Sequence, residues 1–118
     1  MSVVHPARVL VLDDDPMIRR VLERVAQRRD DVTLVTVATP EEVLAHVAEH
    51  ELDLVVCDYQ LRLGGRPITC APLIEELRER GINVAVMTGD ARGVREDLGV
   101  PVLEKPLQLA DLLALVAR

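Results

Sequence analysis

Aromatic residues and cysteines are scarce in this sequence of 118 residues. Tyr59 is its one aromatic residue, and it has neither Phe nor Trp, although 49% of its residues are hydrophobic. Any core must therefore be built from aliphatic side chains. The two cysteines, Cys57 and Cys70, do not make a disulfide framework. Cys57 lies inside an apolar run, where a free thiol behaves as a small hydrophobic side chain.

The sequence also lacks an excess of basic charge and any long apolar run. Its net charge of −6 argues against a protein that binds the phosphate backbone of nucleic acids. No run approaches the roughly 20 residues that cross a membrane, and residues 1–6 lack the apolar region of a signal peptide. We therefore expect a cytoplasmic protein that binds neither nucleic acid nor membrane, with one domain over residues 1–118.

Short apolar runs that end on polar side chains predict the strands. Runs of this length, bounded by polar residues, are typical of strands buried on both faces of a parallel sheet. Each of three such runs stops at a residue that can carry chemistry. These runs are residues 8–12 before Asp13-Asp14-Asp15, residues 54–57 before Asp58, and residues 83–87 before Thr88.

Segments with helical spacing alternate with the strands, and two further strands are expected at residues 32–38 and 100–103. Residues 59–67 are interpreted as a loop with Gly64-Gly65 as its flexible point, and residues 90–99 as at most one or two helical turns. The alternation predicts an α/β fold with a mainly parallel sheet and helices on both faces. The expected helix signals are Pro16 opening the first helix, Thr39-Pro40 with Glu42 capping the second, Gly81 closing the third, and leucines at 109, 112 and 113 in a last helix that runs to the C-terminus.

Parallel strands place their carboxyl ends at one edge of the sheet, so the polar residues that follow them should meet there. Two carboxylates about 4 Å apart repel by roughly 4 kcal/mol at an effective dielectric near 20. The carboxylates of Asp13, Asp14 and Asp58 therefore need protons or a cation, and oxygen ligands at an accessible edge favour Mg²⁺. With the Thr88 hydroxyl and the Lys105 ammonium nearby, such a site is equipped to receive a phosphoryl group.

Four motifs together resemble the receiver domain of bacterial two-component response regulators, across essentially the whole chain. Within that family, the motif residues are most similar to those of receivers in hybrid histidine kinases and of single-domain response regulators. The motifs are Val-Leu-Val-Leu-Asp-Asp-Asp-Pro-Met-Ile-Arg-Arg at 9–20, Asp-Leu-Val-Val-Cys-Asp-Tyr-Gln-Leu at 53–61, Val-Ala-Val-Met-Thr-Gly at 84–89 and Leu-Glu-Lys-Pro at 103–106.

The resemblance implies a flavodoxin-like (βα)5 doubly wound sheet with strand order 2-1-3-4-5. The fourth helix of that fold is expected to be abbreviated here, which departs from the family. It also implies a phosphoacceptor that assists its own phosphorylation and dephosphorylation rather than an enzyme. Its donor would be a histidine kinase or a histidine phosphotransfer protein, and an unknown downstream protein would read the signal. The implied residue roles are Asp58 as phosphoacceptor, Asp13, Asp14, Asp58 and the Gln60 backbone carbonyl as Mg²⁺ ligands, Thr88 and Lys105 as contacts of the phosphoryl group, and Pro106 after a cis peptide bond.

Two positions depart from the family pattern. Val102 stands three residues before the lysine, where most receivers carry the aromatic residue of their conformational switch. Arg62 stands where a loop proline is usual. The phosphoacceptor residues are intact, whereas the usual route from phosphorylation to output is missing.

Other functions and roles stay open. A small phosphohydrolase of the haloacid-dehalogenase type would use Asp13 as nucleophile, with Asp15 two residues on. A pseudo-receiver, which the residue at 102 favours, would signal without phosphorylation. Asp15 is expected only to cap a helix. His46 and His50 have the spacing of metal ligands but no third partner in view, so they are interpreted as ordinary surface histidines.

Overall fold

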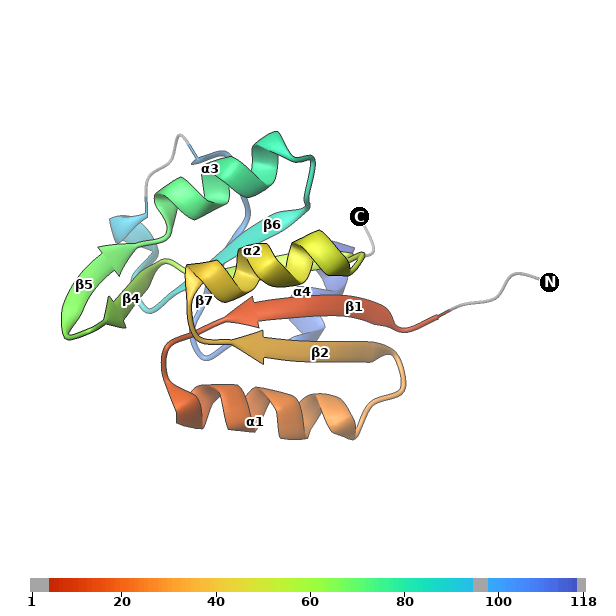
Figure 1. Ribbon diagram of the computed structural model, residues 1–118. Helices are drawn as coiled ribbons and strands as arrows, with labels where there is room; N and C mark the ends of the chain where they lie inside the picture. The colour runs from red at the N-terminus through yellow and green to blue at the C-terminus, as the bar shows by residue number, and fades with distance from the viewer. Residues whose placement is uncertain (1–4, 95–97, 117–118) are drawn as a thin grey trace.

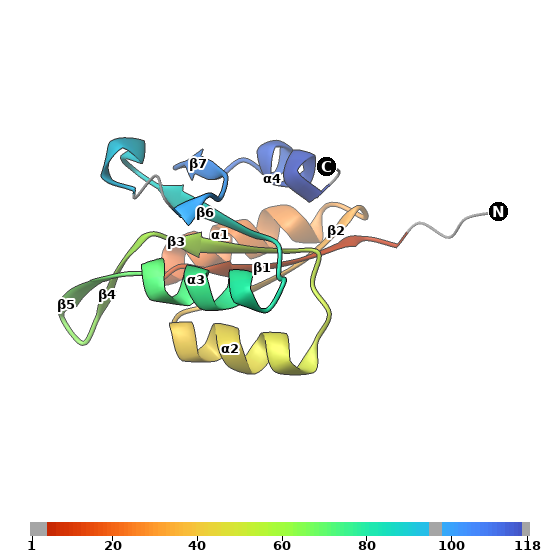
Figure 2. The same cartoon turned by 90° about the horizontal axis from the view of Figure 1, so that it is seen from above.

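The computed structural model describes residues 5–94 and 98–116. Its parallel sheet has the strand order β2-β1-β3-β6-β7, and helices cover both faces (Figures 1 and 2). This is the flavodoxin-like order 2-1-3-4-5 that the resemblance implies. The strands of this sheet are β1 (Ala7–Leu12), β2 (Val32–Val37), β3 (Leu54–Asp58), β6 (Val84–Thr88) and β7 (Val102–Glu104).

Each face of the sheet has its own aliphatic core (Figure 2). Helices α1 (Pro16–Gln27) and α4 (Leu109–Val116) cover one face, and α2 (Pro40–Glu49) and α3 (Ala71–Glu79) cover the other. Successive residues of a strand point to opposite faces, so Leu10 packs in the core under α2 and α3 while Val11 packs under α1 and α4. This two-sided burial explains why the strands are continuous apolar runs.

The helix signals in the sequence correspond to observed caps. The Asp15 carboxylate accepts the backbone N–H of Met17 at 2.9 Å, and the Thr39 hydroxyl accepts that of Glu42 at 3.2 Å. Gly81 follows α3 with a φ of 77°, a left-handed conformation that favours glycine. In the described part of the chain, no helix has the length and apolar character needed to span a membrane.

The largest correction concerns residues 59–67, which do not form the expected loop. Residues 60–69 form an antiparallel hairpin of β4 (Gln60–Leu63) and β5 (Arg66–Thr69), which projects beyond the end of the main sheet (Figure 1). Gly64 and Gly65 both have positive φ, 60° and 77°, as a tight two-residue hairpin turn requires. Two adjacent glycines that follow the alternating residues of β4 therefore indicate a hairpin turn here, and not a flexible loop.

Smaller differences have local causes. The last strand begins two residues later than expected, because Pro101 has no N–H and joins the sheet only by accepting the Val86 N–H at 2.9 Å. At most one or two helical turns were expected over residues 90–99. The structure has a short 3₁₀ turn there, η1 (Ala91–Gly93), and residues 95–97 of this segment lie outside the described residues. Helix α4 is described to Val116, so its expected extension to the C-terminus lies outside them too.

Candidate functional site

Three carboxylates meet at the carboxyl edge of the sheet. Asp13 and Asp14 directly follow β1, and Asp58 is the last residue of the adjacent strand β3. One carboxylate oxygen from each of the three lies within 4.8 Å of the other two. Asp13 and Asp58 are buried and Asp14 is half-buried, so the charges are close together in a site of limited solvent access.

Lys105 places a cation against this cluster. Its Nζ donates to Asp58 Oδ2 at 2.8 Å and lies 3.2 Å from Asp13 Oδ2. The backbone N–H of Lys105 donates to the Thr88 carbonyl at 2.8 Å, which ties the lysine to the end of β6. A cis peptide bond joins Lys105 to Pro106, as the resemblance implies.

The pKa values of the pair reflect opposing influences. Burial raises the pKa of Asp58; its bond with Lys105 works in the opposite direction, and the nearby Asp13 and Asp14 raise the pKa further, so the net shift is upward. Burial alone would lower the pKa of Lys105, but the bond to Asp58 and the charges of Asp58 and Asp13 raise it overall. The lysine therefore stays charged, while ionised Asp58 is disfavoured relative to a carboxylate in water.

The donor set fits a hard divalent cation. Asp13 Oδ2 is fully buried, and Lys105 Nζ at 3.2 Å is its one close partner among the described residues, which leaves a lone pair free for a further positive partner. The three carboxylates form a group of oxygen ligands close enough to share one ion, and Mg²⁺ is bound through one or two carboxylates plus water and backbone oxygens. Gln60 begins β4 directly beyond the site, with Tyr59 between it and Asp58.

Thr88 ends β6, the strand next to β3, and its side chain is bonded within its own turn. The hydroxyl donates to the Asp90 carbonyl and accepts the Asp90 N–H, both at 3.2 Å. Val102 lies on β7 with 39% of its surface exposed, at the edge of the sheet. The site thus combines a buried hydroxyl, held in its own turn, with a strand that carries no aromatic side chain.

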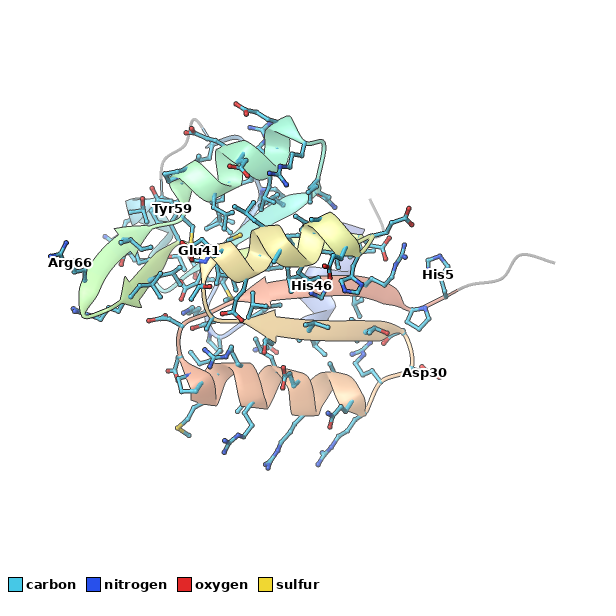
Figure 3. All side chains as sticks on the ribbon, in the orientation of Figure 1. His5, Asp30, Glu41, His46, Tyr59 and Arg66 are labelled. Atoms are coloured by element: carbon cyan, nitrogen blue, oxygen red, sulfur yellow. The ribbon has the colours of Figure 1, made fainter. Side chains whose placement is uncertain are left out.

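The remaining candidates lie elsewhere. The Asp15 carboxylate caps α1, as expected. His46 lies on α2 and His50 follows the end of that helix, with ring centroids 4.4 Å apart (Figure 3 labels His46), but among the described residues no further metal-ligating side chain joins them. Tyr59, expected to be a loop residue, is buried in the core, with its backbone bonded to Met87 and Cys70.

An apolar cavity of about 450 Å³ adjoins the site. Its walls come from the first half of α1, including Met17 and Val21, and from the segment around Pro106. Met17 is 73% exposed and Val21 56% exposed, so this face of α1 is open. Lys105 lines the cavity as well, and it therefore connects the cavity with Asp58.

The fold and site together define a receiver of the two-component type. The sequence matches the response regulator receiver domain family over residues 9–117. The chain therefore belongs to this family, a domain of two-component signalling. A comparison with curated protein sequences finds no match.

Solved structures of similar proteins agree. The BeF3-activated conformation of SdrG from Pseudomonas melonis Fr1 is 30% identical, with a TM-score of 0.77, over 98% of this chain and 100% of that one. A structure of SdrG from Sphingomonas melonis Fr1 is also 30% identical, with a TM-score of 0.71, and the match covers 96% of this chain and 98% of that one. The chemotaxis response regulator CheY4 of Vibrio cholerae, 20% identical with a TM-score of 0.77 over 93% and 98%, shares the fold.

Proposed function

We propose that this receiver domain accepts a phosphoryl group on Asp58 from a phosphohistidine of a kinase or histidine phosphotransfer protein. Asp13, Asp14, Asp58 and the Gln60 backbone carbonyl would hold Mg²⁺. The observation that carries the proposal is the meeting of three carboxylates with one lysine, whose Nζ lies 2.8 Å from Asp58 and 3.2 Å from Asp13. The signal then passes to a downstream protein by contact.

In the proposed transfer, a carboxylate oxygen of Asp58 attacks the phosphorus atom. The bond between phosphorus and the donor's histidine nitrogen breaks, the nitrogen keeps the electron pair and takes up a proton, and an aspartyl phosphate results. Lys105 holds a fixed positive charge beside the new group. The Thr88 hydroxyl leaves Asp90 and donates to a phosphoryl oxygen. When bound, Mg²⁺ neutralises charge on the phosphoryl oxygens.

The apolar cavity beside α1 is the proposed seat of the donor protein. Met17 and Val21 offer an exposed apolar face, and Lys105 connects the cavity to Asp58. A protein seated there brings its histidine next to the phosphoacceptor. Methionine adapts to varied partner surfaces, which suits such a contact.

The phosphohydrolase alternative has less support. It needs a free carboxylate on Asp15, whereas that carboxylate accepts the Met17 N–H as the cap of α1. It also makes Asp13 the nucleophile. Asp13 is fully buried, and its Oδ1 accepts the Asp15 N–H at 2.9 Å.

The proposal is tested by comparing two phosphodonors. Asp58→Asn should accept no phosphoryl group from a phosphorylated histidine kinase or from a small phosphodonor with Mg²⁺. Met17→Glu should slow transfer from the protein donor far more than uptake from the small donor. Glu41→Lys, an exposed position on α2 at the opposite face, is the control and should change neither rate. Continued uptake by Asp58→Asn would refute the proposal.

A further inference from the structure

The β4–β5 hairpin contacts the acidic cluster through its backbone. The N–H of Arg62 donates to Asp14 Oδ2 at 3.0 Å, across 48 residues of sequence. The guanidinium group takes no part in this bond, and the Arg62 side chain is exposed. A backbone donor is held in place by its strand, so the bond links the hairpin's position to that of the carboxylate.

The register of the hairpin explains why this N–H points outward. Arg62 lies opposite Pro67, which has no N–H. In an antiparallel ladder, alternate residue pairs do not bond to each other, and proline is tolerated there. Residues two apart direct their backbone groups to the same side, so the Gln60 carbonyl shares the outer edge of β4 with the Arg62 N–H.

The hairpin is anchored at its base, by a buried leucine and a backbone hydrogen bond. Leu61 is 1% exposed and packs in the core under α2 and α3. Gly64 and Gly65 close the turn with positive φ values, and the Cys70 N–H donates to the Tyr59 carbonyl at the base, at 2.9 Å. Arg66, near the tip, extends away from the body (Figure 3). The anchored half of the hairpin is therefore the half that touches Asp14.

We propose that Arg62 is a positioning residue whose backbone N–H orients the Asp14 carboxylate for Mg²⁺. The inference rests on the proposed function to the extent that it assumes a cation at the acidic cluster. The bond to Oδ2 leaves Oδ1 free to face the ion, and hydrogen bonds to an ionised acceptor are stronger than neutral ones. A proline at position 62, where receivers usually carry one, would supply no such donor.

Two substitutions separate the N–H from the side chain. Arg62→Ala and Arg62→Pro both remove the guanidinium, but only Arg62→Pro removes the N–H. The hairpin should tolerate proline at position 62, because the Arg62 N–H makes no hydrogen bond between β4 and β5. By calorimetry, Arg62→Ala should bind Mg²⁺ within about twofold of the unmodified chain. Arg62→Pro should bind at least roughly tenfold more weakly than Arg62→Ala, the effect of losing one charge-assisted hydrogen bond.

A measurement on the unmodified chain tests the proposed role of the Arg62 N–H even if Arg62→Pro does not fold. By NMR, the Arg62 amide should exchange with solvent more slowly when Mg²⁺ is added, because the ion fixes its acceptor. Equal Mg²⁺ affinity of the two variants, or faster exchange of the Arg62 amide with Mg²⁺, would overturn the inference alone. Absence of Mg²⁺ binding to the unmodified chain would overturn the cation site of the proposed function as well.

Discussion

Lys105 Nζ lies 2.8 Å from Asp58 Oδ2, and 47 residues of sequence separate the two. The same ammonium group lies 3.2 Å from Asp13 Oδ2. One cation therefore lies between two buried carboxylates that would otherwise repel each other. Both the stability of the site and the proposed binding of a divalent cation should depend on this arrangement.

Replacing Lys105 should destabilise the fold at neutral pH. In Lys105→Gln, Asp13 and Asp58 lose their shared partner, and we expect a loss on the order of 1–2 kcal/mol, reduced from a fully buried pair by partial solvent access. Urea unfolding measures this loss. Arg92→Gln, which removes an exposed pair with Asp90, should stay within about 0.5 kcal/mol of the unmodified chain. Equal effects of the two substitutions would contradict the proposed role of the lysine.

The raised pKa of Asp58 predicts how stability depends on pH. Because the folded pKa lies above the ordinary 3.8, the folded state binds the proton more tightly than the unfolded state. Stability should therefore fall as pH rises from about 3.8 through the folded pKa. Asp58→Asn should lack this fall and unfold at a higher temperature than the unmodified chain at pH 7.

Asp31→Asn provides a control of opposite sign. A bond from Arg29 lowers the pKa of Asp31, so its contribution is present above the ordinary 3.8 and is lost as pH falls through the folded pKa. Thermal unfolding at several pH values, each compared with the unmodified chain, measures both effects. A lower unfolding temperature of Asp58→Asn at pH 7 would show that Lys105 outweighs burial.

Adjacent aspartates should differ sharply in their effect on Mg²⁺ binding. Asp14→Ala removes a proposed ligand and should weaken binding at least about tenfold, since loss of even an outer-sphere partner costs metal sites 10-fold or more. Asp15→Ala removes only the cap of α1, and should cost about 0.5–2 kcal/mol of stability without changing the Mg²⁺ affinity. Calorimetry and urea unfolding on both variants test this. Unchanged affinity in Asp14→Ala would exclude it as a ligand.

Phosphorylation should act locally. The Thr88 hydroxyl is bonded to Asp90, so its movement toward a phosphoryl group opens that turn. Val102 is exposed at the sheet edge and β-branched, so it cannot transmit the change as an inward-moving aromatic does. Hydrogen exchange with and without a phosphoryl mimic should therefore change mainly in residues 88–98 and 59–67. Residues 95–97 of the first segment lie outside the described residues.

A different pattern would argue against this local response. If the main change in protection falls on residues 100–103 and on α4, the conventional switch operates without its aromatic residue. A ligand shifts a conformational population only through contacts that differ between the two states. The location of the protected amides thus identifies the element that moves.

The sequence was most informative where one physical signal dominates. Continuous apolar runs predicted the strands, because only a strand buried on both faces suits a run of that length and composition. The order of the strands was predicted from the resemblance to receivers. The hairpin was missed because its Gly64-Gly65 turn was interpreted as flexible. The contact of Arg62 with Asp14 could not be predicted, since it depends on the register that this turn sets between β4 and β5. The roles proposed for Asp13, Asp14, Gln60, Thr88 and Lys105 remain predictions.

The most direct test locates the phosphoryl group itself. After incubation with a small phosphodonor and Mg²⁺, mass spectrometry of the intact chain and its peptides should find a single alkali-labile phosphoryl group on Asp58. The nearly isosteric Asp58→Asn should keep the fold and lose the label. A label on Asp13, or an unlabelled chain that binds Mg²⁺ and is folded, would contradict the account.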